Sequence, residues 1–173
     1  MKVPHDCQEE TILNWKQLFD MQAQLDQHIQ RQHCLKGEDL IGRKILAFQV
    51  ELGELANETR CFKFWSLKAP SAPAVILEEY VDGLHFLLSL GLTLGYRFEE
   101  LEAAPGSLDL CGLFQQVYRA ATYFEGETSE TNFLFLFQAF MALAAKLELT
   151  PEKIMAAYGA KNAVNFQRQE EGY

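Results

Sequence analysis

The sequence is poor in the residues that build zinc sites and redox pairs. It holds four cysteines and four histidines, and the cysteines stand singly, without a C-x-x-C pair. The histidines show no HExxH or comparable ligand spacing. The sequence therefore gives no support for a zinc site or a redox dithiol. We expect free thiols, typical of a reducing compartment, at Cys7, Cys34, Cys61 and Cys111.

Long apolar runs and a basic charge balance are also lacking. No stretch reaches the roughly 20 apolar residues that a membrane-spanning helix requires, and residues 1–6 lack the apolar region of a secretory signal. The formal net charge is −9 and the isoelectric point is about 4.9, whereas nucleic acids and anionic membranes bind basic surfaces. We expect a cytoplasmic protein that binds neither nucleic acid nor membrane.

What the chain has in quantity is apolar sequence with helical periodicity. Its 173 residues are 49% hydrophobic and 12% aromatic, enough for a single domain, 1–173, with a sizeable core. Strand signals are nearly absent, and apolar residues recur with the 3.6-residue period of helices. The pattern predicts an all-α fold, a helical bundle of about six helices, over about 9–32, 39–61, 74–94, 108–124, 130–147 and 150–168.

Residues 131–145 form an unusual stretch of the fifth predicted helix. They carry no charge and include four phenylalanines. The stretch is too short to cross a bilayer, so it belongs either in the core or in a subunit interface. A homodimer is a plausible assembly for the chain.

Four carboxylates stand in two matched pairs, Glu51-x-x-Glu54 and Glu79-x-x-Asp82, in two apolar predicted helices. Residues three apart lie on one face of a helix, so two antiparallel helices would bring the four acids together. Crowded carboxylates repel one another, and a divalent cation removes the repulsion. Oxygen-only ligands favour Mg²⁺, which binds through a few carboxylates together with substrate phosphates. The pairs therefore indicate a phosphate-processing magnesium site; the alternative is a solvated acidic face.

A second group of polar residues lies near the C-terminus. Lys161, Asn165 and Arg168 fall at i, i+4 and i+7, on one face of a helix. Lysine and arginine bind phosphate oxygens, and an asparagine amide can donate to and accept from a base or sugar. Beside a magnesium site this face would be the counter-charge for a polyphosphate. On its own it would be a solvated helix whose basic residues suit the helix dipole.

Four further residues are candidates because they lie near these groups. Trp65 could stack on a planar base and Lys63 could reach a phosphate, although an aromatic cluster at a helix end also serves as ordinary core. Gln22 would face the same cleft if the bundle closes, and would otherwise lie on the surface. His85, three residues after Asp82, fits a packed or supporting histidine better than a metal ligand.

These residues together resemble a known pattern. The segments are Glu51-Leu-Gly-Glu54-Leu-Ala-Asn-Glu58, Phe62-Lys63-Phe64-Trp65-Ser66, Glu78-Glu79-Tyr-Val-Asp82-Gly-Leu-His85-Phe86 and Lys161-Asn162-x-x-Asn165-x-x-Arg168-Gln169-x-x-Gly172-Tyr173. They resemble the dimeric all-α dUTPases, a branch of the all-α nucleoside triphosphate pyrophosphatases, from about Leu18 to the C-terminus. The acid pattern alone marks the superfamily, and the FKFW and KNxxNxxRQxxGY segments narrow it to the dUTPase branch.

The resemblance implies Mg²⁺-dependent hydrolysis of dUTP, and of dUDP, to dUMP, with pyrophosphate released from dUTP. It implies two or more Mg²⁺ ions held by the acids Glu51, Glu54, Glu79 and Asp82, which would also orient the attacking water. It places the uracil and deoxyribose among Gln22, Trp65, Phe86 and Asn165. It places the phosphates beside Lys161, Arg168, Lys63 and Tyr173.

One position departs from the family pattern. Asp26 stands in Gln22-x-x-Leu25-Asp26-x-x-Ile29, where family members more often have asparagine. Asparagine donates and accepts, whereas an ionised aspartate only accepts, so the part of Asp26 in base or sugar recognition is unsettled by the sequence. Two alternatives stay open: the same chemistry on another nucleotide, such as dCTP or a modified base, and a non-catalytic helical interaction module.

Overall fold

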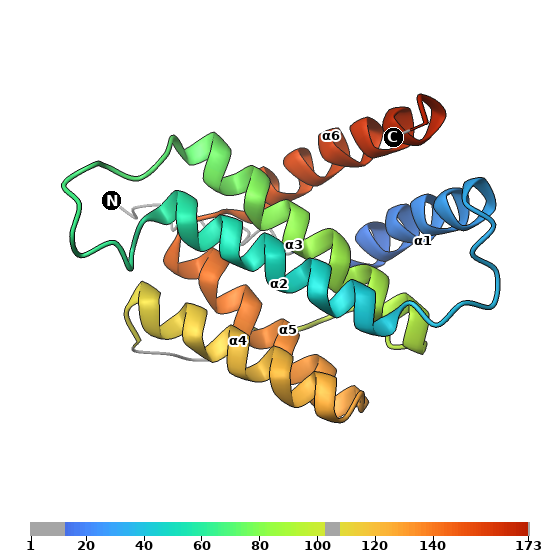
Figure 1. Cartoon of the computed structure of the whole chain (residues 1–173), viewed down its shortest axis with the longest axis horizontal. Coiled ribbons are helices and arrows are strands. Elements are labelled where there is room, and N and C mark those ends of the chain that lie inside the picture. Colours follow the sequence, from blue (N-terminus) through green and yellow to red (C-terminus); the bar gives the residue numbers. More distant parts are fainter. Residues whose placement is uncertain (1–12, 103–107, 173) are drawn as a thin grey trace, which may run out of the picture.

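The structure is a computed structural model that describes residues 13–102 and 108–172. These residues form six helices and no strand: α1 (Trp15–Gln32), α2 (Ile41–Thr59), α3 (Pro73–Leu94), α4 (Leu110–Gly126), α5 (Glu130–Lys146) and α6 (Pro151–Glu170) (Figure 1). The prediction of an all-α bundle of about six helices is confirmed. Most helix ends lie within two residues of their predicted positions.

The first helix begins later than its periodicity suggests. Asn14 caps α1, because its side-chain oxygen accepts a hydrogen bond from the backbone N–H of Gln17 at 3.0 Å. Leu13 and Asn14 therefore precede the helix, and the rest of the expected first turn, 9–12, lies outside the described residues. The start signal of α6 behaves as its sequence indicates, with Thr150 as cap and Pro151 in the first turn.

Helix α3 is the centre of the arrangement. It runs antiparallel to α2, and it also contacts α1, α5 and α6 (Figure 1). Helices α4 and α5 pack against one another on one side of the α2–α3 pair, and α1 and α6 lie on the other side. One face of α3 therefore packs in the core, and another faces α1 and α6.

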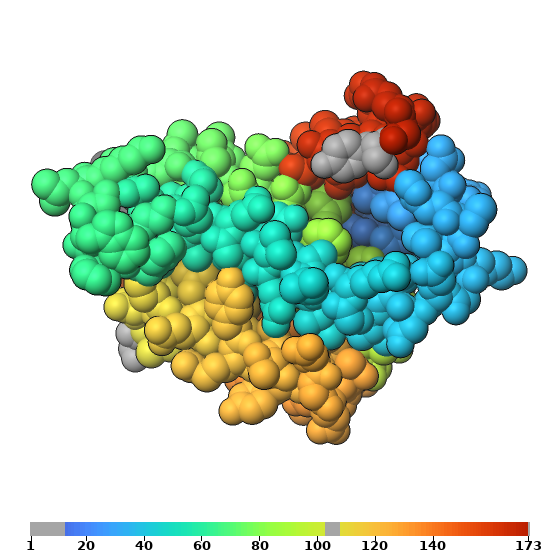
Figure 2. Space-filling model, in the orientation of Figure 1, coloured from blue at the N-terminus to red at the C-terminus, as the bar shows by residue number. Residues whose placement is uncertain are grey.

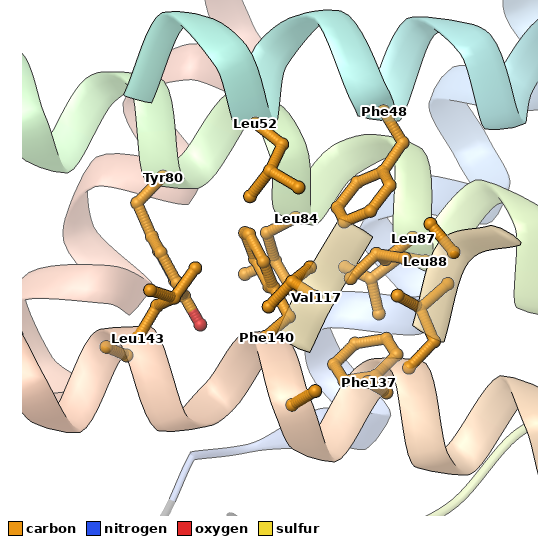
Figure 3. Packing of buried hydrophobic residues seen from close by; sticks show 14 of the residues in the cluster. Phe48, Leu52, Tyr80, Leu84, Leu87, Leu88, Val117, Phe137, Phe140 and Leu143 are labelled. Carbon is orange, nitrogen blue, oxygen red and sulfur yellow. The ribbon is translucent and has the colours of Figure 1, made fainter. Parts of the chain in front are cut away.

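Much of the core lies between α2, α3 and α5 (Figure 3), and buried side chains of α1, α4 and α6 extend it. Phe140 stacks on Tyr80 at 4.4 Å between ring centroids and meets Phe48 edge-on at 5.4 Å. The uncharged stretch 131–145 supplies much of this core, because Phe133, Phe137 and Phe140 fall on one helix face and are fully buried. Phe135, on the opposite face, is 40% exposed.

Glycines let α3 approach its neighbours closely. A β-carbon on Gly91 would lie 2.7 Å from a ring carbon of Phe133 and 2.7 Å from the carbonyl oxygen of Tyr96. Glycine at this position therefore sets the distance between α3 and α5.

Two expectations from composition can be compared with the structure. Cys34, Cys61 and Cys111 are free thiols, and Cys7 lies outside the described residues. Within the described residues, no single helix has the length and apolarity to cross a membrane; one bent pair, 130–146 with 151–170, meets these criteria on length and composition alone.

Candidate functional site

Four helices enclose a cavity of about 370 Å³. Figure 2 shows it as a hollow where α6, in red, faces α1 and α2, in blue and cyan. Among the sequence-predicted site residues, eight line it: Gln22, Asp26, Glu51, Asp82, Phe86, Lys161, Asn165 and Arg168. The other lining residues are Leu25, Ile29, Gln30, Leu35, Leu40, Lys44, His85, Ser89 and Gln169. The cavity thus brings together residues that are far apart in the sequence.

An acid cluster lies at one edge of this cavity. Glu51, Glu79 and Asp82 each offer a carboxylate oxygen, and these three oxygens lie within 4.8 Å of one another. Antiparallel packing of α2 and α3 produces this convergence, as the matched spacing predicts. Glu54 is exposed and stands outside the trio, although its charge is near enough to raise the pKa values of Glu51 and Glu79. The structure therefore brings three of the four predicted acids together.

The cluster is electrostatically unfavourable as it stands. Burial, followed by the charges of Asp82, Glu54 and Glu79, raises the pKa of Glu51 from 4.5 to about 7. Burial and neighbouring acids also raise the pKa of Glu79. Crowded oxygen ligands with excess negative charge are the donor set of a hard divalent cation. The residues present therefore fit a Mg²⁺ ion.

Lys161 provides part of the compensating charge. Its Nζ lies 2.6 Å from Asp82 Oδ2 and 2.9 Å from Glu78 Oε1, and its side chain is 13% exposed. Burial raises the pKa of Asp82, and the hydrogen bond and charge of Lys161 oppose this rise without cancelling it. Asn165 and Arg168 follow on the same face of α6 and line the cavity. The predicted polar face of α6 does point into the cavity.

A polar network forms the floor of the cavity. Gln22 is 3% exposed and His85 is 5% exposed, and His85 Nδ1 lies 2.8 Å from Gln22 Oε1. Tyr158 donates its hydroxyl to the same oxygen at 2.5 Å and stacks on His85 at 4.0 Å between ring centroids. Burial lowers the pKa of His85 to about 3, helped by the charge of Lys161. The imidazole is therefore neutral near pH 7.

Asp26 sits in an ion pair that the sequence did not reveal. Lys44 Nζ lies 3.6 Å from Asp26 Oδ2, Ser89 Oγ donates to the same oxygen at 2.6 Å, and Lys44 also donates to Thr93 Oγ1 at 2.7 Å. Sequence reasoning missed Lys44, Ser89 and Tyr158. Spacing offers a signal for two of them, because Ser89 follows Asp82 by two helical turns and Tyr158 precedes Lys161 by one.

The loop between α2 and α3 does not bring its candidates to the cavity. Trp65 is 65% exposed and packs edge-on against Phe64, with ring centroids 4.9 Å apart. Lys63 donates a hydrogen bond to the side chain of Asn57, and neither Trp65 nor Lys63 lines the cavity. The remaining candidate, Tyr173, lies outside the described residues.

Comparison with known proteins adds one positive finding. A protein-family model described as dUTPase matches residues 14–173, a range that spans all six helices, the acid cluster and the cavity. Comparison with curated proteins finds no match.

Proposed function

We propose how this chain, which belongs to the dUTPase family and hydrolyses dUTP as a dUTP diphosphatase, carries out its reaction. The acid cluster binds Mg²⁺, and the cavity beside it binds the nucleotide. One observation carries the proposal: Glu51 and Asp82 belong to the acid cluster and also line a cavity that Lys161 and Arg168 line from α6. Metal ligands and phosphate-binding cations thus face one space.

The metal would be held by carboxylates from two helices. Glu51 from α2 and Glu79 and Asp82 from α3 form the set that converges. Glu54, one turn beyond Glu51, can join them by a change of side-chain rotamer, which gives enough oxygen ligands for two ions. Bound Mg²⁺ neutralises phosphate charge and lowers the pKa of water. The carboxylates of the chain orient the attacking water and accept its proton.

The phosphates of dUTP would lie between the acid cluster and α6. Lys161 donates to a phosphate oxygen as a point charge, and Arg168 does so as a planar fork. Water attacks a phosphorus, the bond to the leaving phosphate oxygen breaks, and dUMP and pyrophosphate are released. The diphosphate dUDP offers the same scissile linkage with phosphate as leaving group, so we include it as a substrate.

The nucleoside would fill the part of the cavity farther from the acids. Gln22, Phe86 and Asn165, which line the cavity together with the apolar Leu25 and Ile29 of α1, would contact it. Trp65 and Lys63 reach the nucleotide only if the loop 60–72 moves toward the cavity. Such a movement would cover the base with an aromatic face and exclude water from the phosphates.

A nucleotide panel tests the proposed function. Purified protein is incubated with Mg²⁺ and dUTP, dUDP, dCTP, dTTP or UTP, and nucleoside monophosphate and pyrophosphate are measured. We expect dUMP from dUTP and dUDP, pyrophosphate from dUTP, and loss of turnover in EDTA that Mg²⁺ restores. Faster hydrolysis of dCTP than of dUTP would assign the chain to another nucleotide, and turnover unaffected by EDTA would exclude the proposed metal site.

We also propose a cytoplasmic homodimer. Large apolar side chains remain exposed on α2 and α4: Leu46 is 61% exposed, Val50 49% and Tyr123 63%. These helices touch, because Tyr118 Oη donates to the carbonyl oxygen of Gln49 at 3.2 Å, so their exposed faces are neighbours. Sedimentation analysis of the wild type and of Tyr123→Glu tests the proposal. A dimer that the substitution weakens supports it, and a wild-type monomer contradicts it.

A further inference from the structure

His85 leaves one hydrogen-bonding atom unused at the floor of the cavity. The side chain is 5% exposed and lines the cavity. Its Nε2 has no hydrogen-bond partner among the described residues. A buried polar atom without a partner is unfavourable, and because His85 lines the cavity, a ligand bound there is the candidate to supply the partner. Whether Nε2 donates or accepts depends on where the imidazole carries its proton.

Asp26 sets the orientation of the neighbouring amide. Gln22 Nε2 donates to Asp26 Oδ1 over 2.7 Å. The other oxygen of Asp26 accepts from Ser89 and faces Lys44. Because a carboxylate accepts hydrogen bonds and donates none, the nitrogen of the Gln22 amide, rather than its oxygen, must face Asp26.

The oriented amide then determines the tautomer of His85. With its nitrogen toward Asp26, Gln22 presents Oε1 to Tyr158 and to His85 Nδ1. An amide oxygen is an acceptor, so Nδ1 must carry the proton of the neutral ring. Nε2 is consequently a lone-pair acceptor. A ligand must bring an N–H or O–H group to this point of the cavity.

We propose that His85 Nε2 accepts a hydrogen bond from the N3–H group of uracil and that Asp26 is a positioning residue for this contact. The inference rests on the proposed function, in which this cavity holds the nucleoside of dUTP. The uncharged base suits this place, since Gln22 and His85 are buried and neutral. The second N–H of Gln22, which Asp26 does not use, suits a carbonyl oxygen beside N3.

The contact provides discrimination between two nucleotides of the same size. Uracil carries a hydrogen at N3, whereas cytosine carries a lone pair there. A fixed acceptor attracts the first and repels the second, and a mismatch of buried polar groups discriminates more strongly than packing does. Asp26 contributes indirectly, because it holds Gln22 and thereby keeps His85 in the tautomer that accepts.

Nitrogen-15 NMR of histidine-labelled protein tests the tautomer without nucleotide. Protonated and lone-pair ring nitrogens have separate shifts, and the His85 signals are assigned by their loss in His85→Asn. We expect a lone-pair Nε2 in the free protein and a shift of this signal on adding dUMP but not dCMP. Asp26→Asn frees the Gln22 amide to rotate, so both tautomers should appear. The matched variant Tyr158→Phe keeps Asp26 and should keep the original tautomer. A protonated Nε2 in the wild type would overturn the proposal.

Calorimetry then separates the base from the sugar. The ligands are dUMP, dCMP and 2′,3′-dideoxyuridine monophosphate, and thermal unfolding verifies that each variant is folded. His85→Asn keeps an amide N–H near the position of Nδ1 and removes the outer nitrogen. The substitution should lower the affinity for both uracil nucleotides by about tenfold. The affinity for dCMP should stay the same or rise. Equal losses for dUMP and dCMP, or a loss that disappears with the dideoxy nucleotide, would assign the acceptor elsewhere and overturn the inference.

Turnover of dUTP by the wild type distinguishes failure of the His85–uracil contact from failure of the proposed function. If the wild type hydrolyses dUTP while the His85 tests fail, the inference alone is wrong. If the wild type neither hydrolyses dUTP nor binds dUMP, the proposed function is wrong as well. If His85→Asn does not fold, the wild-type shift with dUMP against dCMP decides the question.

Discussion

Lys161 Nζ lies 2.6 Å from Asp82 Oδ2, so a cation of α6 already occupies the acid cluster of α3. The same lysine is the first of three polar side chains that face the cavity from α6. It therefore stands between the acids that would bind metal and the space that would hold phosphates. Its substitution should affect the two ligands in opposite directions.

We expect Lys161→Met to strengthen Mg²⁺ binding to the nucleotide-free protein and to weaken the binding of dUTP. Methionine retains apolar length but removes the charge that competes with the metal, so Mg²⁺ should bind several-fold more tightly. The KM for dUTP should rise by about tenfold, as expected for loss of a charged hydrogen bond. Calorimetry and initial rates measure both, with Lys153→Met, exposed on the same helix, as control. An unchanged Mg²⁺ affinity would contradict the competition.

The acids should behave as a unit, with Glu54 as the informative member. Glu51→Gln, Glu79→Gln and Asp82→Asn should each lower kcat by on the order of 10²-fold or more, because each removes a metal ligand. Glu54→Gln should match them if the exposed Glu54 turns into the site. Steady-state rates measure this, and Glu125→Gln, exposed on α4, is the control. Near-normal turnover in Glu54→Gln would restrict the metal set to the three converging acids.

The raised pKa of Glu51 has a consequence for stability. Its pKa is 4.5 as an ordinary value and about 7 in the folded protein, so the folded state binds this proton more tightly than the unfolded chain does. Ionisation of Glu51 therefore opposes folding progressively between pH 4.5 and pH 7 and fully above that. In metal-free protein, Glu51→Gln should raise Tm at pH 8 and raise it less at pH 5.5. A gain of equal size at both pH values would show that charge is not its cause.

Trp65 offers an optical test of loop movement. Trp15 is 2% exposed and Trp65 is 65% exposed, so Trp15→Phe leaves one solvent-facing reporter. If Trp65 stacks on uracil, its fluorescence emission should change on titration with dUMP. Trp65→Ala should then weaken the binding of dUMP by roughly 1–3 kcal/mol. Fluorescence and calorimetry measure these effects. Unaltered emission at saturating dUMP would place Trp65 outside the nucleotide site.

Helical periodicity predicted the six helices, and the paired acids predicted the acid cluster. Both are local patterns, because spacing along one helix fixes which residues share a face. The convergence of Glu51, Glu79 and Asp82 follows once two helices pack antiparallel. The same logic placed Lys161, Asn165 and Arg168 on the cavity side of α6.

Long-range contacts lay beyond this logic. The pairing of Lys44 with Asp26 depends on how α1 and α2 meet around α3, and a lysine in an amphipathic helix otherwise suggests solvent. The loop position of Trp65 has no periodicity to reveal it. Phe135 illustrates the converse, since composition alone grouped it with three buried phenylalanines while its helix face leaves it 40% exposed.

Within the described residues, the cavity takes side chains from α1, α2, α3 and α6 and from neither α4 nor α5. Yet α4 and α5 complete the core, through fully buried rings such as Phe124 and Phe140. Helices α4 and α5 therefore contribute to the core without contributing a side chain to the cavity, whereas α1, α2 and α3 contribute to both. A library confined to the stretches 110–126 and 130–146 therefore changes core packing and no cavity-lining residue, so selection for survival at high temperature leaves every side chain that lines the nucleotide cavity in place.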